Sequence, residues 1–239
     1  MTPVPSPTRP SRVGRRLVQL AAGLVLYGSS VALLIRSRLG NVPWDVLHQG
    51  LARHLHHSIG TVSIAVGAIV LLLWIPLREK PGFGTVSNVV VIGISVDAAL
   101  ALLPGTDSLP VRALLAGAGI ALNAVATAAY IGARLGAGPR DGLMTGLVRR
   151  TGGSVRRVRT VIEVAVVATG WALGGTLGIA TVLYAMAIGP LVQILLRRLT
   201  VGSSSRTTDP PGRTGTTQES RSRRPPPVRY CRRKPRTET

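Results

Sequence analysis

The chain has 239 residues, of which 29 are Lys or Arg and 9 are Asp or Glu, so its formal net charge is +20. Nevertheless, 46% of the residues are hydrophobic, only 16% are charged, and the apolar residues gather in long blocks. This pattern excludes an ordinary soluble domain and predicts an all-α membrane protein that crosses the bilayer several times. The single cysteine excludes an internal disulfide framework, and an aromatic content of 3% does not favour a base-stacking nucleic-acid binder.

Uncharged apolar runs predict the membrane helices, because about 20 helical residues cross the hydrocarbon core. The first run, residues 17–35, is too long for a signal peptide, and Arg36 and Arg38 follow it where a cleavage site of small residues would lie. We expect about six spans in total. They are residues 17–35, 58–77, 84–103, 111–133, 160–173 and 180–196.

The two ends of the chain differ in composition from its apolar part. Residues 1–16 are basic, residues 200–239 are rich in Pro, Ser, Thr and Arg, and we expect both segments to be disordered. Between them we expect two membrane units, repeat A at residues 17–103 and repeat B at residues 104–199.

The distribution of basic residues predicts the orientation in the membrane. With six spans and a cytoplasmic N-terminus, 25 Lys and Arg residues lie on cytoplasmic segments and 4 lie on outer segments. The positive-inside rule therefore places both termini in the cytoplasm. We expect the basic segment at residues 134–159 and the basic tail to attract anionic lipid, and we expect no nucleic-acid partner.

The sequence matches itself when it is shifted by 96 residues. Eight of fourteen positions are identical between residues 38–51 and 134–147, and seven of nineteen between residues 82–100 and 178–196. The shared pattern R-L-G-x-x-P-x-D-x-L-x-x-G-L is too specific for a chance match of apolar segments. Because each half holds three expected spans, the second half enters the membrane from the opposite side. We therefore predict two three-helix inverted repeats, an architecture found in secondary transporters.

Each half also contains a short predicted helix between its first two spans. Pro43 and Pro139 suit a first helical turn, and Asp45 and Asp141 then complement the positive end of the helix dipole. Two interpretations stay open. Each segment is an amphipathic helix at the membrane interface, or the two are re-entrant helices whose ends converge on a substrate.

Polar residues at matched positions of the two halves are candidates for a substrate or ion path. Asp97 lies inside an apolar span, where an unpaired carboxylate is costly, and its repeat partner is Gln193. It is either a proton or cation site facing Gln193 or a protonated group bonded to a neighbouring helix. The full candidate set is Asp45, Asp141, Asp97, Gln193, Trp44, Arg140 and Asn88.

Other polar residues have structural interpretations. Glu163 lies near several arginines at the start of the fifth expected span, which predicts an ion pair, and Asn123 is expected to hydrogen-bond between helices. Four histidines within ten residues resemble a metal tract, but Asp45 is the one carboxylate near them, so an interfacial polar face is the favoured interpretation. We expect no metal and no cofactor. These histidines are His48, His54, His56 and His57.

Three segments carry a resemblance to a known family. They are residues 43–50 (PWDVLHQG), 82–86 (GFGTV) and 136–144 (GAGPRDGLM). In these motifs the chain resembles the YczE/YitT-type family of bacterial integral membrane proteins, over roughly residues 12–198. The resemblance implies a multi-pass plasma-membrane protein of no settled activity, and it brings no catalytic residues with it.

Three classes of function remain open. The first is a transporter or channel for a small solute, with the polar candidates lining its path. The second is a membrane accessory or regulatory protein that acts through a protein partner, for which the basic tail and basic loop are suited. The third, a membrane enzyme, rests on the histidines beside Asp45 alone, and without any nucleotide-binding, metalloprotease or serine-hydrolase motif we do not expect it. Small-residue spacing at Gly170, Gly174 and Gly178 predicts tight helix packing, and such faces also suit a homo-oligomer.

Overall fold

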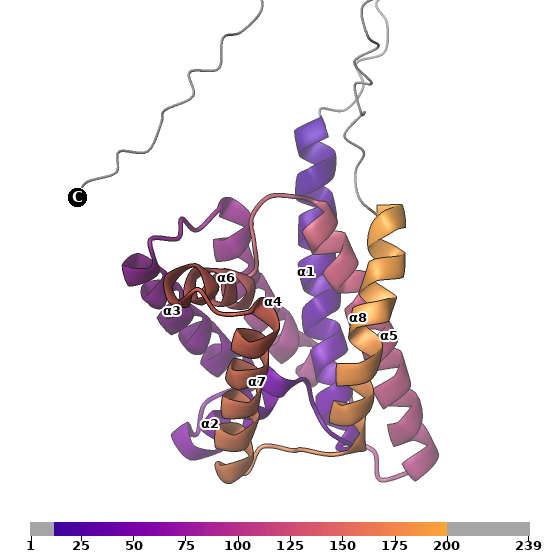
Figure 1. The fold of residues 1–239 in the computed structure, drawn as a ribbon. Coiled ribbons are helices and arrows are strands. Elements are labelled where there is room, and N and C mark those ends of the chain that lie inside the picture. The colour runs from indigo at the N-terminus through magenta and orange to yellow at the C-terminus, as the bar shows by residue number, and fades with distance from the viewer. Residues whose placement is uncertain (1–11, 200–239) are drawn as a thin grey trace, which may run out of the picture. The chain divides into compact units, whose positions relative to one another are not determined.

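The computed structural model describes residues 12–199. Within this range the chain forms eight α-helices and no strand (Figure 1). Residues 1–11 of the expected N-terminal tail and all of the expected C-terminal tail, 200–239, lie outside the described residues. The helices are α1 (Arg12–Ser37), α2 (Pro43–Leu55), α3 (Ile59–Leu77), α4 (Phe83–Leu102), α5 (Leu109–Gly132), α6 (Pro139–Thr151), α7 (Val155–Ala172) and α8 (Ile179–Leu199).

Five of the described helices are long and apolar enough to cross a membrane, namely α1, α3, α4, α5 and α8. The sixth expected span, residues 160–173, lies in α7, which does not meet the same criterion. The reason is its charge, because α7 contains Arg156, Arg157, Arg159 and Glu163. Length and composition therefore give five candidate spans where the apolar runs predict about six.

The first helix begins earlier than its apolar run. Residues 12–16 were expected to belong to a disordered tail, but α1 starts at Arg12. Arginine has a high helix propensity, and a turn of helix that projects from the hydrocarbon core is satisfied by water, so the helix extends beyond the apolar residues.

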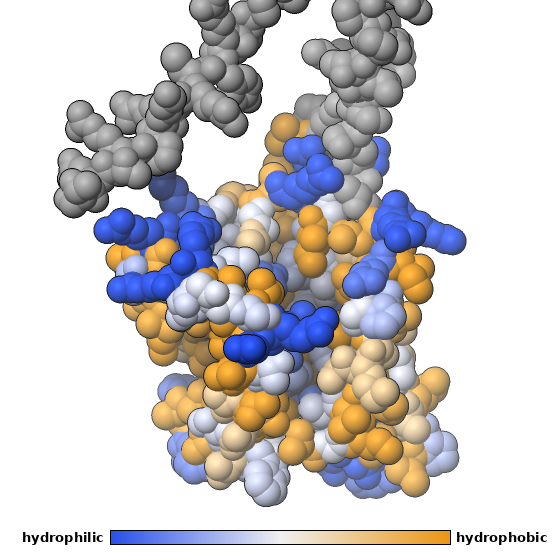
Figure 2. All heavy atoms as spheres, in the orientation of Figure 1, coloured by the Kyte–Doolittle hydropathy of each residue, from blue (hydrophilic) through white to orange (hydrophobic). Residues whose placement is uncertain are grey.

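The spanning helices present apolar side chains on the outside of the bundle. Leu72, Ile94, Leu114 and Met186 are exposed on α3, α4, α5 and α8. Figure 2 shows hydrophobic residues over much of the visible face, with strongly hydrophilic residues mostly in its upper half. A surface of this kind is costly in water and is expected where helices contact lipid chains.

Packing centres on α1, which contacts α4 and α5, while α8 packs on α5. Leu24, Val31, Ile92, Val96 and Ala126 are buried in this core. The short helices lie against the remaining two long helices, α2 on α7 and α6 on α3. They have 13 residues each, and their first residues, Pro43 and Pro139, are 96 positions apart. Their N-termini form the candidate site.

Candidate functional site

The candidate site lies where the N-termini of α2 and α6 approach each other. Pro43 and Pro139 are the first residues of these helices, where the fixed φ of proline favours the helix and its missing N–H leaves no bond unmade. Positive φ angles precede both helices, +129° at Gly40 and +146° at Gly136. Because residues with a Cβ rarely adopt such angles, glycine is required at both turns.

Backbone hydrogen bonds tie the loop before each short helix to the other half of the chain. The N–H of Ala180 donates to the carbonyl of Leu39 at 3.0 Å, and the N–H of Gly84 donates to the carbonyl of Leu135 at 2.9 Å. Ala180 and Gly84 belong to the first turns of α8 and α4. Each loop is therefore anchored to a spanning helix, which holds the start of the short helix in place.

Close packing also fixes the bodies of the short helices. A side chain at Gly170 of α7 would collide with the backbone of Leu47 in α2, and a side chain at Gly142 of α6 would collide with the ring of Trp74 in α3. Trp74 Nε1 donates to the carbonyl of Pro139 at 3.0 Å. The expected tight packing at Gly170 is thus confirmed, and it positions α2 beside the site.

A cavity of about 380 Å³ lies at the two N-termini. Its volume is in the range of small-molecule binding sites. Residues from all eight described helices line it. The aliphatic part of the wall comes mainly from α3, α4 and α8. The polar and aromatic part includes Tyr27, Trp44, His48, Thr127, Arg140 and Tyr184.

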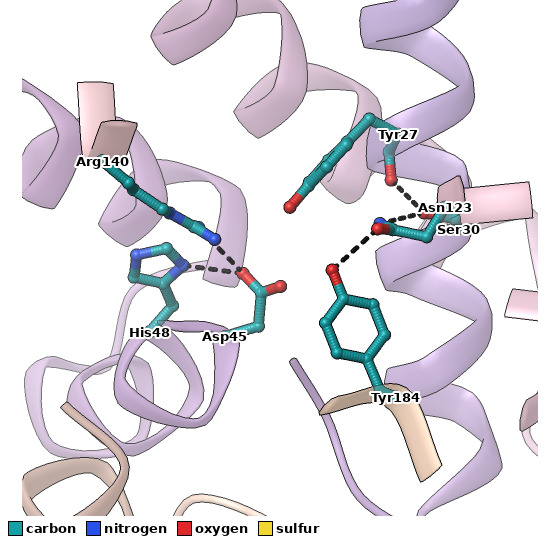
Figure 3. A network of polar contacts seen from close by, with 7 residues as sticks. All are labelled: Tyr27, Ser30, Asp45, His48, Asn123, Arg140 and Tyr184. Atoms are coloured by element: carbon teal, nitrogen blue, oxygen red, sulfur yellow. Dashed lines mark hydrogen bonds and ion pairs between the residues drawn. The ribbon is translucent and has the colours of Figure 1, made fainter. Parts of the chain in front are cut away.

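Arg140 and Asp45 bring opposite charges to this site. Arg140 Nη2 lies 3.7 Å from Asp45 Oδ1, and the same carboxylate oxygen lies 2.9 Å from His48 Nδ1 (Figure 3). The guanidinium also lies over the ring of Trp44, 5.0 Å from its centroid, in a cation–π arrangement. Asp45 of α2 and Arg140 of α6 thus contact each other where the two N-termini meet.

The environment decides the protonation states of this group. Burial lowers the pKa of His48, and the neighbouring Asp45 offsets this only in part, so the imidazole is neutral at pH 7. Burial raises the pKa of Asp45, but the hydrogen bond with His48 and the charge of Arg140 outweigh burial and bring it below its ordinary value. Asp45 is therefore an ionised acceptor, and neutral His48 donates its Nδ1–H to it.

Tyrosines line the cavity on the side of the long helices. The hydroxyl of Tyr184 donates to Asn123 Oδ1 at 2.9 Å, and Asn123 Nδ2 donates to Ser30 Oγ at 2.8 Å (Figure 3). The rings of Tyr27 and Tyr130 meet edge to face, with 6.2 Å between their centroids. The expected role of Asn123 in hydrogen bonding between helices is confirmed, because it links α5 to α1 and α8.

The structure brings most of the sequence candidates to one place. Asp45 is not among the residues that line the cavity, but it contacts two that are, Arg140 and His48. The candidates that line the cavity itself are Trp44, Arg140, Asp141, Asn88 and Gln193.

Asp97 lies elsewhere and has a different environment. Its Oδ1 accepts the backbone N–H of Gly60 at 2.8 Å, and its Oδ2 accepts the hydroxyl of Ser58 at 2.6 Å. Both donors lie at the start of α3, so Asp97 of α4 caps the N-terminus of a neighbouring helix. Asp97 and Gln193, which we expected to face each other, are therefore found at different places in the fold.

The ion pair expected at the start of the fifth span is present. Arg159 Nε lies 2.9 Å from Glu163 Oε1, and both side chains line the cavity. The charges that make α7 the least apolar of the long helices therefore face the cavity in part.

The fold separates the four histidines. His48 is buried at the site, whereas the side chains of His54, His56 and His57 are exposed at the end of α2 and beyond it. Within residues 12–199, no group of three or more His, Cys, Asp or Glu side chains is placed to hold a metal ion.

Sequence reasoning missed the tyrosines. The chain has four, and Tyr27, Tyr130 and Tyr184 all line the cavity. Each lies inside or at the end of an apolar run, where the local pattern does not tell a cavity-facing side chain from a lipid-facing one. Their scarcity is the one signal that marks them, because polar aromatic residues are rare within these runs.

Comparison with known proteins gives the family. A model described as a family of unknown function (DUF6198) matches residues 14–197. The chain belongs to this family. The DUF6198 region includes every residue described above as lining the cavity, so the site lies wholly within the part that the family shares.

One relative of this DUF6198 chain is an uncharacterized protein of Haemophilus influenzae. The two are 38% identical over 177 residues, which cover 74% of this chain and 81% of the relative. The uncharacterized membrane protein YczE of Bacillus subtilis is 32% identical over 177 residues, 73% of this chain and 82% of YczE. The uncharacterized protein YyaS of the same organism is 25% identical over 181 residues, 73% of this chain and 89% of YyaS. The match to YczE confirms the resemblance in the motifs and, with the apolar helices, a membrane protein. No solved structure matches the chain.

Proposed function

We propose that the chain is a transporter or channel in a bacterial plasma membrane, and that a small solute binds in the cavity at the N-termini of α2 and α6. One observation carries this proposal. Two short helices, one from each half of the chain, aim their N-termini at a single polar cavity inside a bundle of apolar helices. In secondary transporters, helix ends that converge near the middle of the bilayer form substrate sites in the same way.

We propose further that the two halves form an inverted repeat about this cavity. Backbone geometry supports the duplication, because the eight positive φ angles among residues 12–199 form four pairs that are 96 residues apart. Such turns depend on local conformation and not on apolar composition. The pairs are Arg38 with Arg134, Gly40 with Gly136, His56 with Gly152, and Arg78 with Gly174.

Contacts between the halves support the inversion. The hydrogen bond from Ala180 to Leu39 and the one from Gly84 to Leu135 are the same contact with the two halves exchanged, since each residue lies 96 positions from its counterpart. The packing of α2 on α7 and of α6 on α3 exchanges in the same way. Reciprocal contacts of this kind are expected around a pseudo-two-fold axis.

In this proposal α7 is the sixth span, and both termini are cytoplasmic. The start of α1 and the end of α8 lie on the same side of the bundle (Figure 1), as an even number of crossings requires. Arg156 and Arg157 are exposed at the start of α7, where they suit the headgroups of anionic lipid, while Arg159 is paired with Glu163. The remainder of α7 after Glu163 is uncharged.

Access to the cavity from both sides of the membrane tests the proposal before the solute is known. Cys231 is replaced by serine, and Ser63, a cavity-lining residue of α3, is replaced by cysteine. A translocation path must open to both sides. We therefore expect a small charged thiol reagent to modify this cysteine in right-side-out vesicles and in inside-out vesicles.

Ser95→Cys in the same background is the matched control. Ser95 packs against Gly28 where α4 meets α1, away from the cavity, so its cysteine should react far more slowly from either side. Modification of the cavity cysteine from one side alone, or from neither, would contradict a translocation path and favour a protein that acts through a partner.

A further inference from the structure

Four polar groups at the site have unused hydrogen-bonding capacity. Among the described residues, Trp44 Nε1, Asp45 Oδ2 and Thr127 Oγ1 are buried and have no hydrogen-bond partner. The guanidinium of Arg140 reaches Asp45 only at 3.7 Å, which is longer than a hydrogen bond. Trp44 is 6% exposed and the side chain of Asp45 is 5% exposed. Because buried groups of this kind are almost always satisfied, they point to a ligand that supplies the missing partners.

These groups comprise two that only donate, one that only accepts, and the hydroxyl of Thr127, which can do either. Arg140 and Trp44 donate only, at the positive ends of two helix dipoles, and so they suit a carboxylate. Asp45 Oδ2 accepts only, and Figure 3 shows it directed toward the hydroxyl ends of Tyr27 and Tyr184. An ammonium group suits this place, because it donates to a carboxylate and is attracted to aromatic rings. The ligand therefore needs an anionic group and a cationic group.

The balance of charge at the Asp45–Arg140 pair favours a zwitterion over simpler ligands. An anion alone would bind beside the carboxylate of Asp45, and a cation alone would bind beside the guanidinium of Arg140, so either would bring an unmatched charge into a buried site. A zwitterion keeps the summed charge of Asp45, Arg140 and the ligand at zero. Because Asp45 and Arg140 lie 3.7 Å apart, the two charges of the ligand must also be close together. This favours an α-amino acid over one with widely separated groups.

The rest of the cavity suits an apolar side chain. Val66 and Val70 of α3, Ile92 of α4 and Ile188 of α8 line it with aliphatic groups, and burying apolar surface against them is favourable. We propose that the solute is a zwitterionic α-amino acid with an aliphatic side chain. Its carboxylate binds Arg140 and Trp44, and its ammonium group binds Asp45. This assignment rests on the proposed transport function.

Competition binding tests the assignment on the purified full-length chain in detergent, with radiolabelled L-leucine as the probe. Leucinamide lacks the carboxylate, N-acetyl-leucine lacks the ammonium group, and 6-aminohexanoic acid separates the two charges. A charge-assisted hydrogen bond is lost or misplaced in each case. We therefore expect each compound to displace the probe roughly ten- to a hundredfold less well than L-leucine does.

Three variants assign the two ends of the ligand. Arg140→Gln should weaken L-leucine binding and abolish the preference for L-leucine over leucinamide. Asp45→Asn should abolish the preference over N-acetyl-leucine. Trp44→Phe keeps an aromatic ring at this position but removes the pyrrole part of the indole together with its N–H. Because the position stays aromatic, the protein should still fold, and it should bind L-leucine at least about tenfold less tightly. Arg149→Gln, at an exposed arginine paired with Glu79, is the matched control and should change nothing.

Equal displacement by a singly charged analogue, or unchanged preferences in the Arg140 and Asp45 variants, would overturn the zwitterion assignment. So would a lack of L-leucine and L-valine binding to a folded chain. These outcomes can be distinguished from failure of the proposed function, because modification of the cavity cysteine at position 63 tests access from each side of the membrane without any solute. If this cysteine reacts from both sides but no amino acid binds, the proposed transport function is retained and an amino acid is rejected as the substrate.

Discussion

Asp45 and Asp97 both lie in a bundle of largely apolar helices, but the hydrogen bonds of their carboxylates differ. Both carboxylate oxygens of Asp97 accept hydrogen bonds from the start of α3, whereas Asp45 shares one oxygen between His48 and Arg140 and keeps the other without a partner. A carboxylate with every oxygen satisfied at a helix terminus stabilises the fold. One with a free buried oxygen beside a cavity is suited to bind a ligand.

The first prediction separates these roles. Asp97→Ala removes one of the two side chains that cap α3, the other being Ser58, and we expect it to lower the free energy of unfolding by about 1 kcal/mol, the usual cost of a lost cap. Thermal unfolding in detergent measures this loss. Asp107→Ala is the matched control, because Asp107 is exposed in its ion pair with Arg38 and should change stability by less than about 0.5 kcal/mol.

Solute binding should survive in the Asp97→Ala variant, because Asp97 does not line the cavity. A variant that folds with wild-type stability but no longer binds L-leucine would indicate that Asp97 belongs to the solute path. That result would contradict its assignment as a cap.

The site residues could be predicted from sequence only where a local motif marks them. Asp45 and Asp141 stand out because each follows a helix-starting proline in the repeated motif, and Trp44 and Arg140 lie between proline and aspartate in that motif. The role of Asp97 could not be predicted, because its partners Ser58 and Gly60 are distant in the chain and meet it only when α3 and α4 pack.

Among the elements, the short helices were the clearest in the sequence. The proline positions predict where α2 and α6 begin, and both begin there. The two open interpretations of these segments concern their depth in the membrane, which depends on tertiary packing. Their packing on α7 and α3 depends on the close approach of Gly170 to the backbone of α2 and of Gly142 to the ring of Trp74, and a linear pattern does not reveal such pairs.

The packing of α2 against Gly170 of α7 gives a second prediction. A Cβ at Gly170 would overlap the backbone of Val46 and Leu47, which cannot rotate away as a side chain can. Gly170→Ala should therefore push α2 from α7 and cost about 1–3 kcal/mol of stability. It should also weaken L-leucine binding, since α2 carries Trp44 and Asp45.

Gly117→Ala provides the control for Gly170→Ala. Gly117 lies within α5, and a Cβ there meets nothing within 4 Å. Because alanine has the higher helix propensity, this variant should be as stable as the wild type or more stable by up to about 1 kcal/mol. Equal midpoints of thermal unfolding for the two variants would show that α2 is not held at Gly170.

The arrangement of the complete bundle explains why α7 is less apolar than its neighbours. Its charged residues lie at its start and along the cavity, so a helix of mixed composition still fits among apolar helices. In the proposed six-span arrangement, hydropathy alone therefore misses one span, because that span borders a polar cavity. Position in the repeat predicts that α7 corresponds to α3, which is one of the five apolar candidates.

Opposite orientation of the two halves is the point on which the proposed path depends. Ser58 and Ser154 test it well, because both are exposed, both immediately precede a long helix, and they lie 96 residues apart. Each is replaced by cysteine in a chain with Cys231→Ser, and intact cells are treated with a membrane-impermeant maleimide. We expect labelling of the cysteine at position 58, and labelling of the one at position 154 only after the cells are permeabilised. Labelling of both in intact cells, or of neither while both react in permeabilised cells, would contradict the inverted repeat.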